Sequence, residues 1–392
     1  PLVAVIQSLG TGIGMGGAIY YSISRAEKKE ARAKAFTAGA VWLLIVTSVF
    51  VTITFFFLSS FLLRLLGAGN QLLSLGEDYI SIIALGAGLQ IIGTGLVPFI
   101  RNHGDSSYAM FSMIAGFVTN IILDYLFVWV LGQGLSGAAW ATVIGQGVTM
   151  LSALVYLLWK KQFTLKIAFG DIGKVSLSII KVGIAPFGLA MTPNLSMIII
   201  NRFSVFYGGE QAIATYASIG YVMSIIYLIL QGVGDGSQPI MSKYYGEKAF
   251  DRLKNIMRLA NGSGILLSVI GCVIMYVARA DIGLLFGTSN EVNAEIQKTI
   301  PIFLISVPFV SINRITTASF YATEKSIFSY ILSFVEPIFM LILMLILPTL
   351  FGGQIMIWWS TVFARILSAI LALILKQHAD EKEILVSANN EY

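Results

Sequence analysis

Long apolar stretches alternate with short polar breaks along the whole chain. A helix that crosses the hydrocarbon of a bilayer takes about 20 apolar residues. The segments that meet this length are Leu2–Ser24, Ala35–Leu58, Tyr79–Ile100, Tyr108–Leu131, Gly137–Trp159, Gly183–Val205, Ala212–Gly232, Ile256–Ala278, Ile300–Phe320, Ile327–Leu350 and Ile355–Leu375. The pattern predicts an all-α polytopic membrane protein, and the short breaks leave no room for a soluble catalytic domain.

The pattern also repeats itself after about 220 residues. A charged, helix-forming run, RAEKKEARAK at 25–34, returns as YGEKAFDRLK at 245–254. Two further pairs follow at a similar offset: 61–71 with 282–291, and 99–118 with 319–335. Self-similarity at a fixed offset in a membrane chain is typical of a transporter built from two fused bundles.

The repeat is incomplete at its start. The span Gly183–Val205 precedes the second copy, and its partner would fall before residue 1. We therefore expect a missing first helix, with eleven of twelve transmembrane helices in this sequence; an eleven-helix chain with an unpaired half is the alternative. The predicted parts are an N-terminal lobe (1–159), an inter-lobe linker (160–176), a C-terminal lobe (177–376) and a tail (377–392). Two six-helix lobes of equal topology would be related by a pseudo-two-fold axis along the membrane normal.

Composition agrees with this class of protein. Hydrophobic residues make up 57% of the chain and charged residues 11%, and the mean hydropathy is +0.83, whereas a soluble domain carries about 25% charged residues. Lys and Arg gather in the breaks at 25–34, 160–174 and 243–254 and in the tail, and are scarce in the alternate breaks. This bias predicts a multi-pass protein of the bacterial plasma membrane with both native termini in the cytoplasm. The net charge of +5 then requires no nucleic-acid partner.

Few ionisable residues lie inside the predicted spans, and placing each of them in the bilayer costs free energy. Asp124 lies one helical turn after Asn120 on the same face, and Thr142 in the next span adds a hydroxyl. A carboxylate with an amide oxygen suits Na⁺, and a buried carboxylate can instead carry a proton. We expect Asn120, Asp124 and Thr142 to form a cation-coupling site, with hydrogen bonding to a neighbouring helix as the alternative role of Asp124.

The second half contributes a second set of charged candidates. Asp235 lies in LQGVGDGSQPI, which reads as a broken, glycine-rich helix end near the cytoplasmic face. Glu336 precedes Pro337, and Arg314 and Arg365 lie in nearby spans of the same half. An internal ion pair is the first expectation for these spans, and a charge or gating role for Asp235, Glu336 and Arg314 is the second.

Several classes of site are excluded. AFGDIGKV at 168–175 lacks the first glycine and the Ser/Thr of a phosphate-binding loop. No Ser/His/Asp or metal-ligand arrangement is apparent, and His103 in the short loop RNHGDSS is expected to be solvated. The chain is predicted to be neither an enzyme nor a cofactor protein, with Na⁺ or H⁺ as its coupling ion and no metal beyond Na⁺ at Asp124.

Several motifs resemble the multidrug and toxic compound extrusion (MATE) family. NIILD at 120–124, followed by a turn and GLSGAAWATVIGQ at 134–146, is the most specific match. FIRNHGD at 99–105 and QGVGDGSQPIMSKYYGEK at 231–248 extend it, the latter in the manner of the bacterial branch that includes multidrug exporters of Gram-positive bacteria. The resemblance covers essentially the whole chain.

The resemblance implies a V-shaped exporter of two six-helix lobes, driven by entry of Na⁺ or H⁺. The family's first-lobe cation site has an Asn and an Asp four residues apart and a Thr on the following helix, which match Asn120, Asp124 and Thr142. Its further carboxylate lies on the first helix and has no counterpart in this sequence. The second-lobe carboxylates of another branch also have no clear equivalents, since Asn194, Asn313 and Arg314 stand there, which favours coupling in the first lobe.

Members of such a family export amphipathic organic cations, so we expect a monomeric antiporter whose partners are these molecules and membrane lipid. A promiscuous cleft between the lobes would present aromatic, methionine and polar side chains. The candidates are Gln90, Met191, Asn194, Tyr216, Tyr221 and Met223, for each of which helix packing is the alternative role. A flippase for lipid-linked saccharides or other amphipathic lipids is the main rival, and a receptor or scaffold is a remote one.

Overall fold

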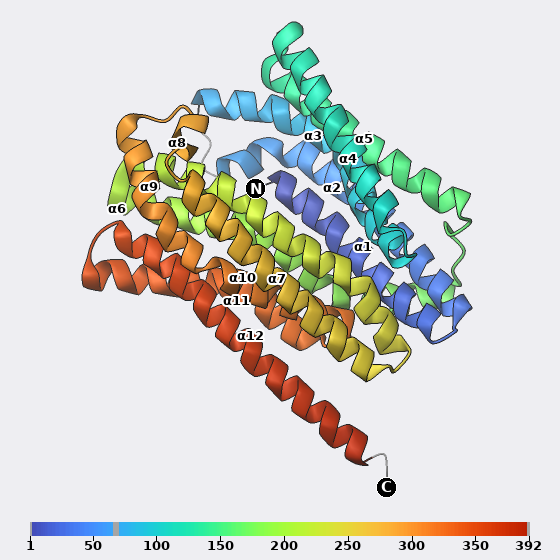
Figure 1. Ribbon diagram of the computed structural model, residues 1–392. Coiled ribbons are helices and arrows are strands. Elements are labelled where there is room, and N and C mark those ends of the chain that lie inside the picture. The colour runs from blue at the N-terminus through green and yellow to red at the C-terminus, as the bar shows by residue number, and fades with distance from the viewer. Residues whose placement is uncertain (1, 66–69, 390–392) are drawn as a thin grey trace. The chain divides into compact units, whose positions relative to one another are not determined.

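The computed structural model describes residues 2–65 and 70–389, and every element in these two ranges is helical (Figure 1). The helices are α1 (Leu2–Ala26), α2 (Glu30–Leu65), α3 (Asn70–Asn102), α4 (Ser106–Asp124), η1 (Tyr125–Val130), α5 (Gly134–Trp159), α6 (Phe169–Gly246), α7 (Phe250–Ala278), α8 (Ile282–Leu285), α9 (Asn290–Ile305), α10 (Val307–Ala322), α11 (Ser326–Phe351) and α12 (Ile355–Asn389). Residues 66–69, inside the repeat segment 61–71, and the end of the predicted tail at 390–392 lie outside the described residues.

Two breaks reconcile these helices with the predicted spans. The 78-residue α6 is interrupted at Gly209, whose φ of 63° and ψ of −157° suit a residue without a Cβ. The predicted spans Gly183–Val205 and Ala212–Gly232 lie on either side of it. Helices α9 and α10 meet at Ser306 with a bend of 42° and together hold the span Ile300–Phe320. In the described ranges, nine helices can cross a membrane, or ten if α9 and α10 form one span; dividing α6 at Gly209 gives the eleven predicted.

The first compact unit comprises residues 1–190 with 242–248. Within it, α3 packs against α1, α2 and α5, and α4 packs mainly against α5. The small residues of α1 also let the start of α6 approach closely. A Cβ on Gly12 would lie 2.8 Å from the carbonyl oxygen of Gly183. The glycine run at 10–17 therefore serves close helix packing, as small residues do in membranes.

The second compact unit comprises residues 191–241 and 249–392. Here α10 packs against α7, α11 and α12, and α11 packs against α12, which runs back along α11 and continues beyond its first residues in Figure 1. Its largest apolar cluster surrounds Trp358, whose ring centroid lies 5.5 Å from that of Phe303 and 5.9 Å from that of Tyr216. The lobe limits 1–159 and 177–376 stay a prediction, and the chain is helical again from Phe169, inside the predicted linker.

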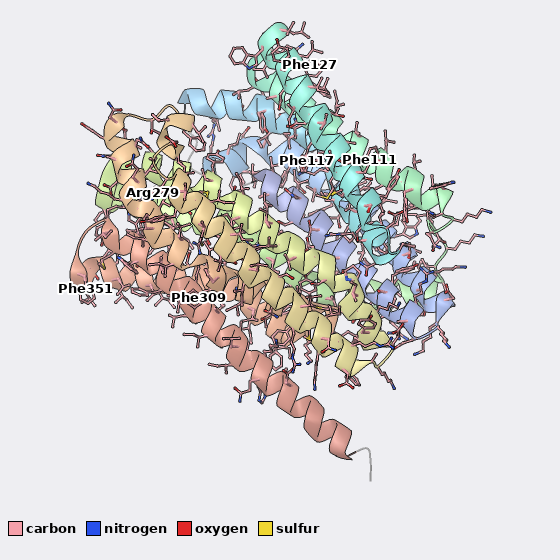
Figure 2. All side chains as sticks on the ribbon, in the orientation of Figure 1. Phe111, Phe117, Phe127, Arg279, Phe309 and Phe351 are labelled. Carbon is pink, nitrogen blue, oxygen red and sulfur yellow. The ribbon has the colours of Figure 1, made fainter. Side chains whose placement is uncertain are left out.

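The outward surface of these helices is apolar. Phe111 and Phe117 on α4 are 58% and 56% exposed, and Phe351 at the end of α11 is 71% exposed (Figure 2). Exposed apolar surface on this scale is unfavourable in water and favourable in a bilayer. Together with the apolar helices of spanning length, it identifies a multi-pass membrane protein.

Candidate functional site

Two glycines bring α4 and α5 close enough to share a polar face. A Cβ on Gly145 of α5 would lie 2.8 Å from the carbonyl oxygen of Gly116 and 2.9 Å from the Cβ of Asn120, both on α4. Because Gly116, Asn120 and Asp124 follow one another at intervals of one turn, they lie on the same face of α4. The apolar side chains on the other faces, such as Ile121 at 65% exposure, point to the lipid.

Two buried polar atoms on this face lack a hydrogen-bond partner among the described residues: Nδ2 of Asn120 and Oδ1 of Asp124. The oxygen and nitrogen of an Asn side chain exchange places by a half-turn of the amide. Asn120 can therefore present its oxygen beside the carboxylate of Asp124. Unpartnered polar atoms are costly in a bilayer, so a bound cation or proton would stabilise this face.

Asp124 also lies where the helix changes its geometry. It is the last residue of α4, and the following turn, η1, is a π-helix in which the amide of Leu131 donates to the carbonyl of Leu126 over 2.9 Å. Single π-helical turns are rare and often occur at functional sites. The wider turn begins directly after the carboxylate-bearing residue.

Thr142 and Tyr79 complete the surroundings of Asp124. The Thr142 hydroxyl donates to the carbonyl of Ala138 over 3.0 Å and interacts with the hydroxyl of Tyr79 on α3, which also feels the charge of Asp124. The structure thus brings Asn120 and Asp124 of α4 together with Thr142 of α5, and Tyr79 adds a third helix, α3. Tyr79 was not predicted, because it is merely the first residue of an apolar span in the sequence.

The donor set suits a hard monovalent cation or a proton. It offers one carboxylate, one amide and hydroxyls from Thr142 and Tyr79. Within the ranges 2–65 and 70–389, no three His, Cys, Asp or Glu side chains group as a metal site. Oxygen ligands of this kind fit Na⁺ and do not fit a transition metal.

The second unit contains a buried ion pair of a different character. Nε of Arg365 on α12 donates to Oε1 of Glu336 on α11 over 3.1 Å, with the two side chains 6% and 9% exposed. Nη1 of Arg365 donates to the hydroxyls of Tyr227 and Ser306 over 2.6 Å and 3.1 Å. Further hydrogen bonds of this kind are what make a buried ion pair tolerable.

Arg314 on α10 belongs to the same region but has a neutral partner. Its Nη1 donates to Oε1 of Gln231 on α6 over 3.1 Å. Glu336 and Asp235 are the carboxylates whose charges act on it. The expectation of a broken helix end at Asp235 is wrong, because α6 continues through Gly246 and its one non-helical residue is Gly209. In a bilayer a glycine-rich stretch stays helical, since its backbone groups find no water.

A cavity of about 350 Å³ in the second unit is lined by Arg314, Arg365 and Glu336 but not by Asp235. Four of the six predicted cleft residues line it: Asn194, Tyr216, Tyr221 and Met223. Met191 is half-buried on α6 outside its lining, and Gln90 is buried on α3 of the first unit. The cavity therefore combines apolar walls with a few polar groups, as small-molecule sites do.

Comparison with known proteins decides the family. The sequence model of the MatE family matches residues 1–126 and 186–346. The chain belongs to the MatE family. The multidrug export protein MepA of Staphylococcus saprophyticus is 24% identical to it, over 96% of this chain and 83% of the relative.

Solved structures agree in fold with this MatE protein. An outward-facing multidrug resistance MATE transporter of the MOP superfamily superposes with a TM-score of 0.89 at 20% identity, covering 97% of this chain and 86% of the other. A MOP superfamily transporter from Pyrococcus furiosus gives the same figures. The predicted family and the predicted all-α, two-lobed membrane fold are confirmed, and membership makes the protein a transporter rather than an enzyme.

The expectation that His103 of this MatE protein is solvated is wrong. His103 is half-buried: its ring stacks on that of Tyr21 with centroids 4.5 Å apart, and Nδ1 donates to the carbonyl of Phe99. The hydroxyl of Tyr21 in turn accepts from Nη1 of Arg25 over 2.9 Å. Polar neighbours in the loop RNHGDSS concealed a contact with a helix far away in sequence.

The partners of the buried arginines were also missed. Arg365 donates to Tyr227 and Ser306, and Arg314 donates to Gln231. The signal that these partners exist is the presence of two arginines in apolar spans, since such residues need hydrogen bonds. The sequence offers no signal for which residues supply them.

Proposed function

We propose that the chain is a secondary active exporter of amphipathic, often cationic, drugs or toxic compounds. It exchanges them for Na⁺ or H⁺ by alternating access of its two lobes. The naming of its relatives as multidrug export proteins supports the substrate class. Their bacterial origin supports a place in a bacterial plasma membrane. The gathering of Lys and Arg in alternate breaks supports both native termini in the cytoplasm.

The observation that carries the coupling role is the unpartnered Oδ1 of Asp124 at membrane depth. A carboxylate with a fixed cationic partner cannot easily release and rebind an ion. Asp124 has no such partner among the described residues, and Asn120, Thr142 and Tyr79 stand beside it. Loading and unloading of a cation here would change the charge of the α4–α5 face, which is how a gradient can bias one conformation over another.

The test is efflux of ethidium from vesicles that contain the purified chain, under an imposed Na⁺ or H⁺ gradient. We expect one gradient to drive efflux and Asp124→Asn to reduce it at least about tenfold, because the amide can no longer carry the charge. Asp105→Asn is the matched control. Asp105 caps the other end of α4, where its side chain accepts from the amide of Tyr108 over 3.1 Å, and Asn caps a helix equally well.

Full efflux by Asp124→Asn would remove Asp124 from the coupling mechanism. Equal losses in the two variants would point to damage of α4 rather than to ion coupling. If the unaltered chain exports no ethidium under either gradient, the drug-export proposal fails, and the flippase alternative is tested next with a fluorescent lipid.

A further inference from the structure

The cavity of the second unit holds unequal numbers of positive and negative groups. Arg314, Arg365 and Glu336 all line it. Two guanidinium groups therefore share one carboxylate on its wall. Asp235 also acts on Arg314 electrostatically, but it is not part of the lining.

Glu336 is already engaged by one of the two arginines. Its Oε1 accepts from Nε of Arg365 over 3.1 Å, and the remaining contacts of that guanidinium go to Tyr227 and Ser306. The guanidinium of Arg365 also lies 5.0 Å from the centroid of the Tyr227 ring. Arg365 is thus held in place by groups of the protein itself.

Arg314 is the guanidinium with unused binding capacity. It is 7% exposed, and its hydrogen bond goes to the neutral side chain of Gln231. Within the part of the chain that the structure describes, it forms no ion pair with a carboxylate. A guanidinium has five N–H donors in a fixed plane, and burying it without a close counter-charge is costly.

The rest of the lining is suited to the apolar part of a small molecule. Tyr216, Ile219, Met223 and Phe303 are at most 8% exposed and line the cavity together with Val310. A volume of about 350 Å³ lies in the range of small-molecule sites. The cavity therefore offers an apolar, aromatic wall and one planar cation.

We infer that this cavity binds amphipathic molecules that carry a carboxylate, with Arg314 as the group that receives it. The planar fork of the guanidinium matches a carboxylate with two parallel hydrogen bonds. A zwitterionic amphiphile, with an ammonium group as well, satisfies Arg314 and keeps the cationic character of the proposed substrates. The inference rests on the proposed function, because the molecule that binds would be an exported one.

Binding to the purified chain in detergent tests this with a matched pair of probes. Nα-dansyl-lysine carries an aromatic group, an ammonium and a carboxylate, and its methyl ester lacks only the carboxylate charge. Dansyl fluorescence reports transfer to an apolar site. We expect the acid to bind at least about tenfold more tightly than the ester, as charge-assisted hydrogen bonds allow.

Arg314→Gln should abolish this preference while ester binding changes little. Arg314→Lys keeps the charge without the planar fork and should retain part of the preference, which also covers the case that Arg314→Gln does not fold. Arg202→Gln removes an exposed cation of the same unit and should leave the preference unchanged. Equal affinities of acid and ester, or a full preference in Arg314→Gln, would overturn the inference.

The binding measurement is independent of any ion gradient. A retained acid preference with no ethidium efflux would overturn the proposed function and leave the carboxylate site standing. Ethidium efflux without a preference for the acid would overturn the carboxylate site and leave the proposed function standing.

Discussion

Asp124 and Glu336 are both carboxylates within membrane spans, yet their surroundings are opposite. Glu336 has Arg365 at 3.1 Å, and both side chains are nearly inaccessible. Asp124 lies on a helix that is mostly exposed to lipid, and its buried Oδ1 has no partner among the described residues. A carboxylate with a fixed counter-charge joins helices, whereas one without remains available to a mobile cation.

The largest difference between the two carboxylates is expected when each is replaced by its amide. Glu336→Gln leaves the guanidinium of Arg365 buried without its counter-charge, and we expect a loss of about 3–5 kcal/mol in the free energy of unfolding. Asp124→Asn removes a charge that has no protein partner, so we expect a change below about 1 kcal/mol. Thermal unfolding of both variants in one detergent measures the difference.

A double variant separates the ion pair from the volume of its side chains. Adding Arg365→Gln to Glu336→Gln removes the stranded charge and should recover most of the lost stability. A double variant as unstable as Glu336→Gln alone would show that packing, not charge, holds α11 to α12. A large loss in Asp124→Asn would make its carboxylate a structural group.

A smaller effect is expected where the first unit depends on close backbone approach. Gly145→Ala would place a Cβ 2.8 Å from the carbonyl oxygen of Gly116, so α4 and α5 must separate. We expect a loss of about 1–3 kcal/mol in unfolding free energy and a weaker response of efflux to the driving ion, because Asn120 moves away from α5.

The matched control is Gly173→Ala near the start of α6, where an added Cβ meets nothing within 4 Å. Alanine favours a helix over glycine by roughly 0.5–1 kcal/mol, so this variant should be as stable as the unaltered chain or more so. Equal stability of Gly145→Ala and Gly173→Ala would mean that α4 and α5 are not closely packed.

The smallest expected effect contrasts the two histidines. Burial lowers the pKa of His103 below its ordinary 6.5, and the hydrogen bond to the Phe99 carbonyl offsets this only in part. The unfolded chain therefore takes up this proton at a higher pH than the folded one. The stability that depends on neutral His103 is complete above pH 6.5 and is lost as the pH falls from there through the lower folded value.

We expect the loss from His103 at about pH 5 to stay below about 1 kcal/mol. Melting temperatures between about pH 7.5 and pH 5 would fall less for His103→Gln than for the unaltered chain. His378 on α12 is exposed, and His378→Gln serves as the control. The same pH response in the two variants would contradict the burial of His103.

The spans could be predicted because lipid imposes a simple rule of length and polarity. Even the division of α6 was foreseen, since polar residues and two glycines separate Val205 from Ala212. The same logic failed at Asp235, where glycine and proline indicated a break that the helix does not have. Hydropathy therefore predicts which segments lie in the membrane, but glycine and proline there do not show whether the helix is broken.

In the candidate site, too, contacts within one helix could be predicted and contacts between helices could not. Asn120 and Asp124 could be paired from their spacing on one helix. Tyr79 could not, because its contact with Thr142 depends on how α3 and α5 pack. An internal ion pair of Glu336 and Arg365 could be expected because an unpaired charge in a membrane span is unfavourable. The hydroxyls of Tyr227 and Ser306 could not, because their contacts with Arg365 depend on how the helices pack.

The contacts of Arg365 with Ser306 and Glu336 have a consequence during synthesis of the chain. The Ser306 hydroxyl donates to the Phe303 carbonyl over 2.6 Å and accepts from Arg365, which follows 59 residues later in the chain. Glu336 precedes Arg365 by 29 residues. At roughly 5–20 residues per second of synthesis, an emerging chain holds Glu336 for about one to six seconds before its partner exists. Glu336 on α11 therefore lacks its counter-charge until α12 has been made.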